Sequence, residues 1–375
     1  MGFSDNFSEV AVAPVHWVKD SGVPYSQRSL DESAFARRCG ELVLVTGASG
    51  MLGREVALQL LRQGYDVRVM QRSDSRITEL LPASIVERFS QHRGAITDVA
   101  AVEQAMSDVD GVVHLAAKVS FAGAWEEFVH TNVQGTEVLL SQAQAARISR
   151  FLFISSPSVA HTGVSFMGEG NGPATPELAR GHYARSKAMA EQLALAADTD
   201  DFLVGVIRPH IVWGPGDTQL VERVLERAAR GTLPLLNGGA ALIDTTYIDN
   251  AVDAIVAGFT RLDVIHGTPL VVTNGQPREV AEIIAGMCLA VGVTPPRYSI
   301  PASVARGAGT LIEKIWDIRP GEDEPPMTAF LAEQLSTSHW FDQRRTRELL
   351  DWAPAVSIEQ GYSKLGSYYG DYWRK

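Results

Sequence analysis

The sequence contains only two cysteines, Cys39 and Cys288, and they lie far apart along its 375 residues. Two distant thiols cannot form the disulfide framework of a small secreted domain, and they lack the close spacing of zinc ligands. We therefore expect isolated reduced thiols and no bound metal.

Positive charge and long apolar runs are also scarce. The 33 lysines and arginines are outnumbered by 44 aspartates and glutamates, which gives a formal net charge of −11. Without a basic stripe to neutralise phosphates, a nucleic-acid partner is not expected. No apolar run approaches the roughly 18 residues of a membrane-spanning helix, and Met1–Val10 lacks the apolar core of a secretory signal. These absences predict a cytoplasmic protein.

What the sequence does contain is a regular alternation of short apolar runs with segments of helical spacing, which follows a mixed polar tail over residues 1–38. The runs predict buried strands at residues 42–45, 66–70, 111–115, 150–154 and 202–208, with another strand within 84–97. Helices are expected at residues 52–63, 99–106, 126–146 and 183–197. This alternation predicts an α/β fold with a Rossmann-type doubly wound parallel sheet.

A glycine-rich turn, Thr46–Gly53, separates the first apolar run from the helix that follows it. Glycine lets the backbone approach a pyrophosphate, and the amino end of a helix attracts its negative charge. A tight strand-to-helix turn without a ligand is the alternative interpretation. We predict a dinucleotide site formed by Gly47, Ser49, Gly50, Met51, Leu52 and Gly53.

Beyond residue 210 the alternation loosens. Helices are expected at residues 220–230, 248–259, 278–291 and 302–316, short strands at 243–247 and 270–273, and a loop at 320–326. We therefore predict an NAD(P)-binding Rossmann domain at residues 39–210, to which later segments near 243–275 return. The remaining residues, 211–375, are predicted to form mainly a smaller C-terminal substrate-binding lobe.

A tyrosine and a lysine four residues apart, Tyr183 and Lys187, share one face of a predicted helix. An ammonium group beside a phenol favours the phenolate and lowers the phenol pKa from its reference value of about 10. Such a tyrosine could exchange a proton with a substrate oxygen near neutral pH, while a bound dinucleotide carries hydride. The pair and the glycine turn together predict carbonyl reduction or alcohol oxidation.

The end of the second predicted strand discriminates between the two nicotinamide cofactors. An acidic residue about 20 positions beyond the turn usually holds the ribose 2′-hydroxyl of NAD, whereas arginine accommodates the 2′-phosphate of NADP. Here the strand runs into Gln71 and Arg72, so no carboxylate repels a phosphate and Arg72 can pair with one. We predict NADP(H), with NAD(H) and a solvated Arg72 as the alternative.

Several further positions follow predicted strands at the sheet edge where ligands bind in open α/β folds. Asp98 is predicted either to frame the adenine pocket or to cap the next helix. The small side chains of Ala116 and Ala117 would leave room for the ribose and nicotinamide, and Pro209 could seat the carboxamide face. Ser156 could hydrogen-bond a substrate carbonyl, although serine also favours turns.

In this order the motifs resemble the extended short-chain dehydrogenase/reductase family. The matching positions are Thr46–Gly53, His114–Ala117, Asn132, Ser156 with Val159, Tyr183 with Lys187, and Arg208 with Pro209. Within that family the chain resembles the 3β-hydroxysteroid dehydrogenase-like branch, and in particular the bacterial 2-alkyl-3-oxoalkanoate reductases of long-chain olefin biosynthesis. Two positions depart from the pattern: Ala95 stands where the superfamily often has Asp, and His210 where the olefin branch is expected to have Arg.

The resemblance implies NADPH-dependent reduction of a 2-alkyl-3-oxoalkanoate, a long-chain β-keto acid, to the 2-alkyl-3-hydroxyalkanoate. Tyr183 would protonate the developing alkoxide, Lys187 would lower the Tyr183 pKa and bind the nicotinamide ribose, and Ser156 would hydrogen-bond the carbonyl oxygen. The candidate partners for the substrate carboxylate are Lys118, Arg185 and His210.

Three alternative functions remain open. A 3β-hydroxysteroid or sterol dehydrogenase uses the same three residues but normally oxidises, often with NAD. A sugar-nucleotide epimerase would need a basic set for a diphosphate, which the second half of the chain does not show. A non-catalytic NADP-binding regulator would usually have lost the tyrosine or the lysine.

An apolar stripe in the second half of the chain is compatible with several partners. It could line a cleft for alkyl chains, pack in the core, or rest on a membrane surface or a pathway enzyme. The resemblance also implies a homodimer that forms through helices of the Rossmann domain. The stripe consists of Val304, Ala308, Leu311, Ile312, Ile315 and Trp316.

Overall fold

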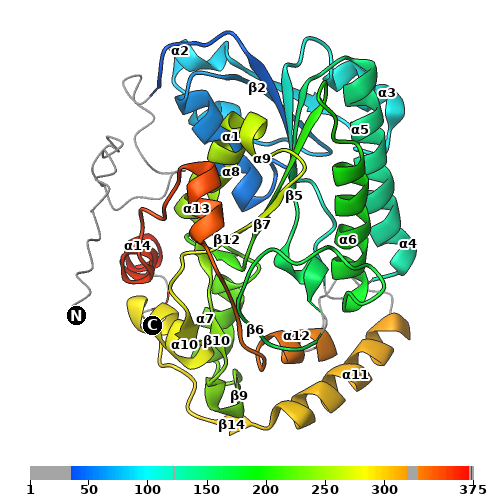
Figure 1. Ribbon diagram of the computed structural model, residues 1–375. Coiled ribbons are helices and arrows are strands. Elements are labelled where there is room, and N and C mark those ends of the chain that lie inside the picture. Colours follow the sequence, from blue (N-terminus) through cyan, green and yellow to red (C-terminus); the bar gives the residue numbers. More distant parts are fainter. Residues whose placement is uncertain (1–34, 121–122, 162, 319–327, 371–372, 374–375) are drawn as a thin grey trace, which may run out of the picture.

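The computed structural model in Figure 1 describes residues 35–120, 123–161, 163–318, 328–370 and 373, with only the backbone of residues 313–318 and 330. Most of the predicted tail and the predicted loop at 320–326 therefore lie outside the described residues.

A seven-stranded parallel sheet, in the order β12-β7-β5-β4-β1-β2-β3, forms the centre of the fold. Strands covered on both faces must be apolar nearly throughout, which is why most of them appear in the sequence as short apolar runs. The strand order reverses between β1 and β4, and this is where open α/β sheets form a ligand crevice. The strands are β1 Leu42–Thr46, β2 Asp66–Gln71, β3 Phe89–Arg93, β4 Gly111–His114, β5 Arg150–Ile154, β7 Leu203–Pro209 and β12 Pro269–Val272.

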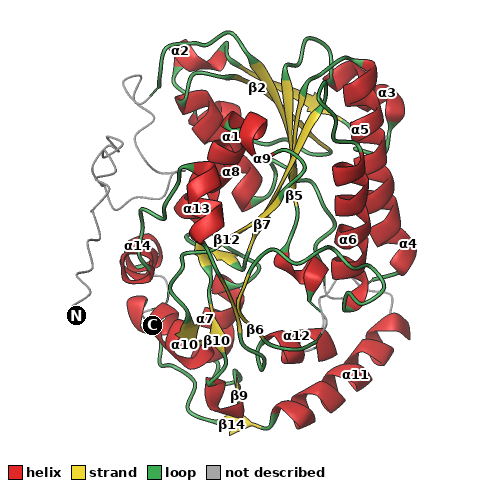
Figure 2. Ribbon diagram, in the orientation of Figure 1, coloured by secondary structure: helices red, strands yellow, loops and turns green. Residues whose placement is uncertain are grey.

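Helices cover both faces of this sheet, as Figure 2 shows, and each face has its own apolar cluster. On one face lie α1 Met51–Arg62, α8 Ile248–Thr260, α9 Leu262–Ile265 and α13 Arg344–Leu350. On the other lie α3 Val99–Ala105, α5 Gly135–Ala145 and α6 Gly181–Ala196. Shorter elements are the 3₁₀ turns Ile77–Leu80 and Pro157–Ala160, α2 Ala83–Val86, α4 Trp125–Phe128 and a π-helical segment, Val129–Gln134.

Most of the remaining elements gather beyond one end of the sheet, in the lower half of Figure 1, whereas α14 lies at its left, below α13. A four-stranded sheet has the order β13-β10-β15-β6, and β8 pairs with β11 as β9 does with β14. The strands are β6 Phe166–Glu169, β8 Val212–Trp213, β9 Leu235–Leu236, β10 Leu242–Ile243, β11 Thr246–Tyr247, β13 Arg278–Glu279, β14 Ser299–Ile300 and β15 His339–Phe341. The helices are α7 Val221–Ala229, α10 Val280–Ala290, α11 Ala302–Ile318, α12 Ala329–Gln334 and α14 Ile358–Tyr369, with a 3₁₀ turn at Asn237–Gly239.

Helix α11 packs on a different face from the apolar stripe noted in the sequence. Ala302 and Ala305 are buried, and a Cβ at Gly309 would lie 2.5 Å from the backbone nitrogen of Ala329, so small residues form the contact with α12. Val304 and Leu311, from the stripe, are 58% and 62% exposed. The close approach of α12 requires small side chains and leaves the larger ones outside. The side chains of Ile315 and Trp316 lie outside the described residues.

Candidate active site

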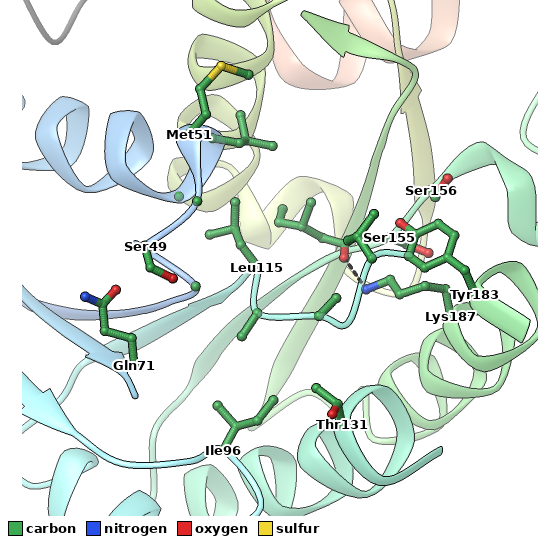
Figure 3. A pocket seen from close by; sticks show the side chains of 18 of the residues that line it. Ser49, Met51, Gln71, Ile96, Leu115, Thr131, Ser155, Ser156, Tyr183 and Lys187 are labelled. Carbon is green, nitrogen blue, oxygen red and sulfur yellow. Dashed lines mark hydrogen bonds between the residues drawn. The ribbon is translucent and has the colours of Figure 1, made fainter. Parts of the chain in front are cut away.

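A cavity of about 690 Å³ opens at the carboxyl ends of the central strands (Figure 3). Its wall is formed by residues that follow β1, β2, β4, β5 and β7 in turn. All the predicted glycine-turn residues line it, as do Arg72, Ala116, Ala117, Ser156, Tyr183, Lys187 and Pro209. The fold therefore brings most of the predicted site residues together from across 163 positions of sequence, Gly47 to Pro209.

The glycine turn is shaped by two close backbone approaches. A Cβ at Gly47, whose φ is +81°, would lie 2.7 Å from the backbone nitrogen of Ala116, and a Cβ at Gly53 would lie 2.3 Å from the carbonyl oxygen of Gly47. The Gly50 N-cap gives α1 no side-chain cap, so the first N–H groups of this helix face the cavity without a capping side chain. Free N–H groups at a glycine-rich helix end fit the pyrophosphate of a dinucleotide.

A buried hydrogen-bond chain fixes the ends of β1 and β4 on either side of this turn. The hydroxyl of Thr46 accepts from the backbone N–H of Ala116 at 3.1 Å and lies 2.7 Å from Nδ1 of His114. Nε2 of His114 lies 3.0 Å from the hydroxyl of Thr136, which donates to the carbonyl of Asn132 at 2.7 Å. Since each hydroxyl has one proton to donate, His114 must accept at Nδ1 and donate at Nε2. Sequence reasoning gave His114 no such role.

Tyr183 and Lys187 both face the cavity from α6, but the environment of Tyr183 is not the one that the sequence predicted. Burial raises the pKa of the Tyr183 phenol to about 12, and hydrogen bonding with Ser156 opposes this shift. The ammonium of Lys187 instead donates to the carbonyl of Ile154 at 2.6 Å, as Figure 3 shows, and lies 4.0 Å over the ring of Phe153. Desolvation therefore outweighs the expected effect of the lysine, and the phenol keeps its proton at neutral pH.

Burial also changes the protonation of Lys187. It lowers the pKa of the ammonium group to about 7, while the nearby charge of Glu191 acts in the opposite direction. Lys187 is 3% exposed. Within the part of the chain that the structure describes, its ammonium group forms no ion pair with a carboxylate and donates to a backbone carbonyl instead. Its charge at neutral pH therefore depends on small changes in its surroundings.

Two serines end β5 at the cavity wall. The Oγ atom of Ser156 accepts from the backbone N–H of Ser158 at 3.3 Å and caps the following 3₁₀ turn, so the predicted turn chemistry and a cavity position occur together. Ser155 is 6% exposed, and its hydroxyl has no hydrogen-bond partner within the described part of the chain. It lines the cavity as well, which the sequence reasoning missed. Its position directly before Ser156 was the available signal.

Asn132 lies in the π-helical segment behind the cavity. Its Oδ1 accepts from the backbone N–H of Lys118 at 2.7 Å, and its Nδ2 donates to the hydroxyl of Ser186 at 2.9 Å. Asn132 thus connects the segment that follows β4 to α6, the helix that carries Tyr183 and Lys187.

The end of the cavity beside β2 contains Gln71 and Arg72. Gln71 donates to the carbonyl of Ser73 at 2.9 Å, whereas Arg72 is exposed. Asp98 is not among the residues that line the cavity; its carboxylate caps α3 by accepting from the N–H groups of Ala100 and Ala101. Within the described chain, no aspartate or glutamate lines the cavity.

The structure does not bring the three predicted carboxylate partners into this cavity. Lys118 pairs with Glu127 at 2.8 Å, and the guanidinium of Arg185 lies 4.8 Å from the ring centre of Trp125. His210 is 6% exposed, and its Nδ1 lies 2.6 Å from the carbonyl oxygen of Asp244. Pro209 and Ile211 line the cavity on either side of it, but the histidine side chain is buried in the core behind them.

Comparison with known proteins gives consistent matches. The family model described as the NAD dependent epimerase/dehydratase family matches residues 43–272. A 2-alkyl-3-oxoalkanoate reductase of Stenotrophomonas maltophilia is 35% identical over 86% of this chain and 98% of its own length. A protein of the same name from Shewanella oneidensis is 32% identical over 86% of this chain and 84% of its own length. A 3 beta-hydroxysteroid dehydrogenase/Delta 5→4-isomerase of Mycobacterium tuberculosis is 26% identical over 91% and 94%.

Solved structures match the fold. The terminal R domain of the myxalamid PKS-NRPS biosynthetic pathway superimposes with a TM-score of 0.70 at 23% identity, covering 91% of this chain and 94% of its own. UDP-glucuronic acid 4-epimerase from Bacillus cereus, solved with NAD, gives 0.67 at 21% identity, covering 88% and 99%. At these identities the likeness concerns the fold alone.

Proposed function

The chain belongs to the NAD dependent epimerase/dehydratase family, and we propose that it is an NADPH-dependent reductase of 2-alkyl-3-oxoalkanoates. The family match and the reductases and dehydrogenases among its relatives make it an NAD(P)-dependent oxidoreductase of the extended short-chain dehydrogenase/reductase type. The single observation that carries the proposal is the placing of Ser156, Tyr183 and Lys187 on one cavity wall, in a chain 35% identical to a reductase of that name.

The charge around the cavity supports NADPH over NADH. Arg72 lines it at the end of β2, and no carboxylate among the described residues lines it to bind a 2′-hydroxyl or repel a 2′-phosphate. A guanidinium can bind phosphate through two parallel hydrogen bonds. We therefore assign Arg72 to the 2′-phosphate of NADPH, and the glycine turn to the pyrophosphate.

For reduction, the proton donor must carry a proton when the reaction starts. A buried phenol with a pKa of about 12 satisfies this at neutral pH, so Tyr183 is proposed to donate its proton to the C3 oxygen. When bound, NADPH supplies the hydride to the C3 carbon. Ser156, half-buried at the end of β5, is proposed to donate a hydrogen bond to the same oxygen as negative charge develops on it.

Lys187 is proposed to bind the ribose hydroxyls and to stabilise the Tyr183 phenolate that the proton transfer leaves behind. Its side chain is already held in one place by the carbonyl of Ile154 and the ring of Phe153. An ammonium group in a buried site interacts more strongly with a developing anion than it would in water. The fixed position of Lys187 therefore contributes stabilisation without a further loss of side-chain entropy.

A steroid or sterol dehydrogenase is the second candidate, because a 26% identical relative carries that name and covers most of both chains. The two candidates are separated by following NADPH oxidation by absorbance with a synthetic 2-alkyl-3-oxo acid, alongside NADH and a 3-ketosteroid. Fast turnover of the branched keto acid with NADPH is expected. Turnover of the 3-ketosteroid but not of the keto acid would contradict the proposal. Turnover with NADH but not with NADPH would contradict it as well.

A further inference from the structure

Behind the cavity, α6 and β7 are joined by an ion pair to which the mechanism above assigns no role. Nε of Arg208 donates to Oε2 of Glu191 at 2.9 Å, and Nη2 donates to Oε1. The third nitrogen of the guanidinium, Nη1, donates to the carbonyl of Gly172 at 2.7 Å. Arg208 is 1% exposed and Glu191 0%. Burying two charges is costly, so such a pair is seldom retained for stability alone.

Glu191 lies on the same helix as the two cavity residues Tyr183 and Lys187. It lies four residues after Lys187 on α6, hence one turn further along the same helix face, and Tyr183 lies one turn before. Arg208 directly precedes Pro209, which lines the cavity. The ion pair of Glu191 and Arg208 therefore joins the α6 face that carries Tyr183 and Lys187 to the end of β7, where Pro209 lines the cavity.

Lys187 needs a source of negative charge that its direct contacts do not provide. Its contacts are a backbone carbonyl and the Phe153 ring. Two titratable groups interact electrostatically with Lys187, namely His114 from β4 and Glu191 on its own helix, and Tyr183 lies one turn before it on that helix. Burial keeps the Tyr183 phenol protonated, and it lowers the pKa of His114 so that the imidazole is neutral. Among these groups only Glu191 is an acid held in a bidentate ion pair with an arginine.

Arg208 explains why Glu191 can remain charged. A carboxylate buried alone would take up a proton rather than stay ionised, and a bidentate guanidinium prevents this. We propose that Glu191, held ionised by Arg208, is a positioning counterion that keeps Lys187 protonated at neutral pH. The inference rests on the proposed role of Lys187, but it concerns the free protein and requires no substrate.

Removal of the Glu191 carboxylate should lower the pKa of Lys187. Without the carboxylate, nothing opposes the desolvation that already lowers the Lys187 pKa to about 7. In Glu191→Gln the titration midpoint of Lys187 should therefore fall by about one pH unit or more. The midpoint is measured directly by NMR of protein labelled at the lysine side chains, with the Lys187 signal assigned by its loss in Lys187→Met. The pH dependence of NADPH affinity, followed by fluorescence, should shift in the same direction.

Asp249→Asn is the matched control, because it removes a 2% exposed carboxylate that pairs with Lys364 on other helices. It should leave the Lys187 midpoint unchanged. If Glu191→Gln does not fold, the double variant E191M/R208M replaces both charges by packed apolar side chains. Its midpoint should also fall, because the carboxylate that opposes the desolvation of Lys187 is lost.

An unchanged Lys187 midpoint in a folded variant without Glu191 would overturn the inference. A lower midpoint together with no activity on any β-keto acid would support it while overturning the substrate proposal. The two failures are therefore distinguishable.

Discussion

Tyr183 shows how burial can outweigh sequence spacing at a single residue. The spacing to Lys187 predicted a phenol with a lowered pKa, but desolvation of the Tyr183 hydroxyl raises its pKa to about 12. Spacing along a helix gives the neighbours of a side chain, whereas desolvation depends on every element that packs around it. The phenol is consequently suited to donate a proton, which is the direction that ketone reduction requires.

Replacing Tyr183 by Phe removes this donor with little change in shape. Turnover should fall by about two to four orders of magnitude, while NADPH affinity stays within a few fold. Steady-state kinetics and fluorescence titration measure the two quantities. Tyr368→Phe, at an exposed tyrosine of α14, is the control and should change neither. Near-normal turnover in Tyr183→Phe would refute the assigned role.

Arg72 is the residue on which cofactor choice is proposed to depend. Arg72→Gln should weaken NADPH binding by about ten- to a hundredfold, because a charge-assisted bond contributes about 1.5–3 kcal/mol. NADH affinity should barely change. Arg93→Gln is the matched control, since Arg93 ends the neighbouring strand β3 but pairs with Asp74 instead. Equal losses for both cofactors would contradict the assignment.

At the scale of elements, the buried chain through His114 joins β1, β4 and α5. His114→Phe keeps an aromatic ring between Phe151 and Phe153 but leaves Thr46 and Thr136 without their buried partner. We expect a loss of about 1–3 kcal/mol in the free energy of unfolding, measured by urea denaturation. NADPH affinity should fall too, since Thr46 holds Ala116 beside Gly47. An unchanged free energy of unfolding in His114→Phe would show that this chain of hydrogen bonds does not stabilise the fold.

A cluster of histidines connects β7 to the four-stranded sheet and makes stability depend on pH. The ring of His210 lies 5.1 Å from that of His339 and 5.2 Å from that of Phe341. Burial lowers the pKa of His210 to about 4 and that of His339 to about 3. Both rings are therefore neutral in the folded protein at pH values where the unfolded chain would protonate them.

The free energy of unfolding should therefore fall as the pH decreases below about 6.5. The unfolded histidines take up protons below about pH 6.5 and the folded ones only near pH 4 and 3, so the stabilisation is present above pH 6.5 and is lost on the way down. Asp244, whose pKa burial raises to about 6, acts in the opposite direction, but one carboxyl opposes two imidazoles. Urea denaturation from pH 7 to 4 should show the decline, and His339→Phe should flatten it. An equally steep decline in that variant would contradict the argument.

Elements with a strong local signal were predictable. The strands of the central sheet and the helices α1, α3 and α6 lie within a few residues of their expected ranges, because buried parallel strands and amphipathic helices have a clear period. Strand β6 was not predicted, since four residues that include Gly168 gain strand geometry only by pairing with β15 from far along the chain. The packed face of α11 depends likewise on where α12 lies.

At the scale of the whole molecule, charge is distributed unevenly. The chain carries a net charge of −11, yet the described residues that line its cavity include arginine, lysine and histidine but no carboxylate. A cavity lined by cationic side chains and no carboxylate suits anionic ligands despite the negative net charge, and both NADPH and a β-keto acid are anionic. The three side chains that the sequence suggested for the substrate carboxylate, Lys118, Arg185 and His210, do not line this cavity, and their assignment stays a prediction.

Among the described helices, none is both long enough and apolar enough to cross a membrane. The division into residues 39–210 and 211–375 stays a prediction, as do the homodimer and a peripheral membrane or pathway-enzyme contact. The positions that line the cavity could be predicted because they follow strands in order, whereas substrate contacts depend on how the second half of the chain folds over the sheet end.

The central claim, hydride transfer from NADPH to the C3 carbon of a branched β-keto acid, is tested most directly by an isotope experiment. The protein is incubated with NADPH deuterated at C4 of the nicotinamide and a synthetic 2-alkyl-3-oxoalkanoate, and the products are analysed by mass spectrometry. We expect a 2-alkyl-3-hydroxyalkanoate carrying one deuterium at C3, and none of this product with Tyr183→Phe. Deuterium transfer to a 3-ketosteroid but not to the keto acid would contradict it.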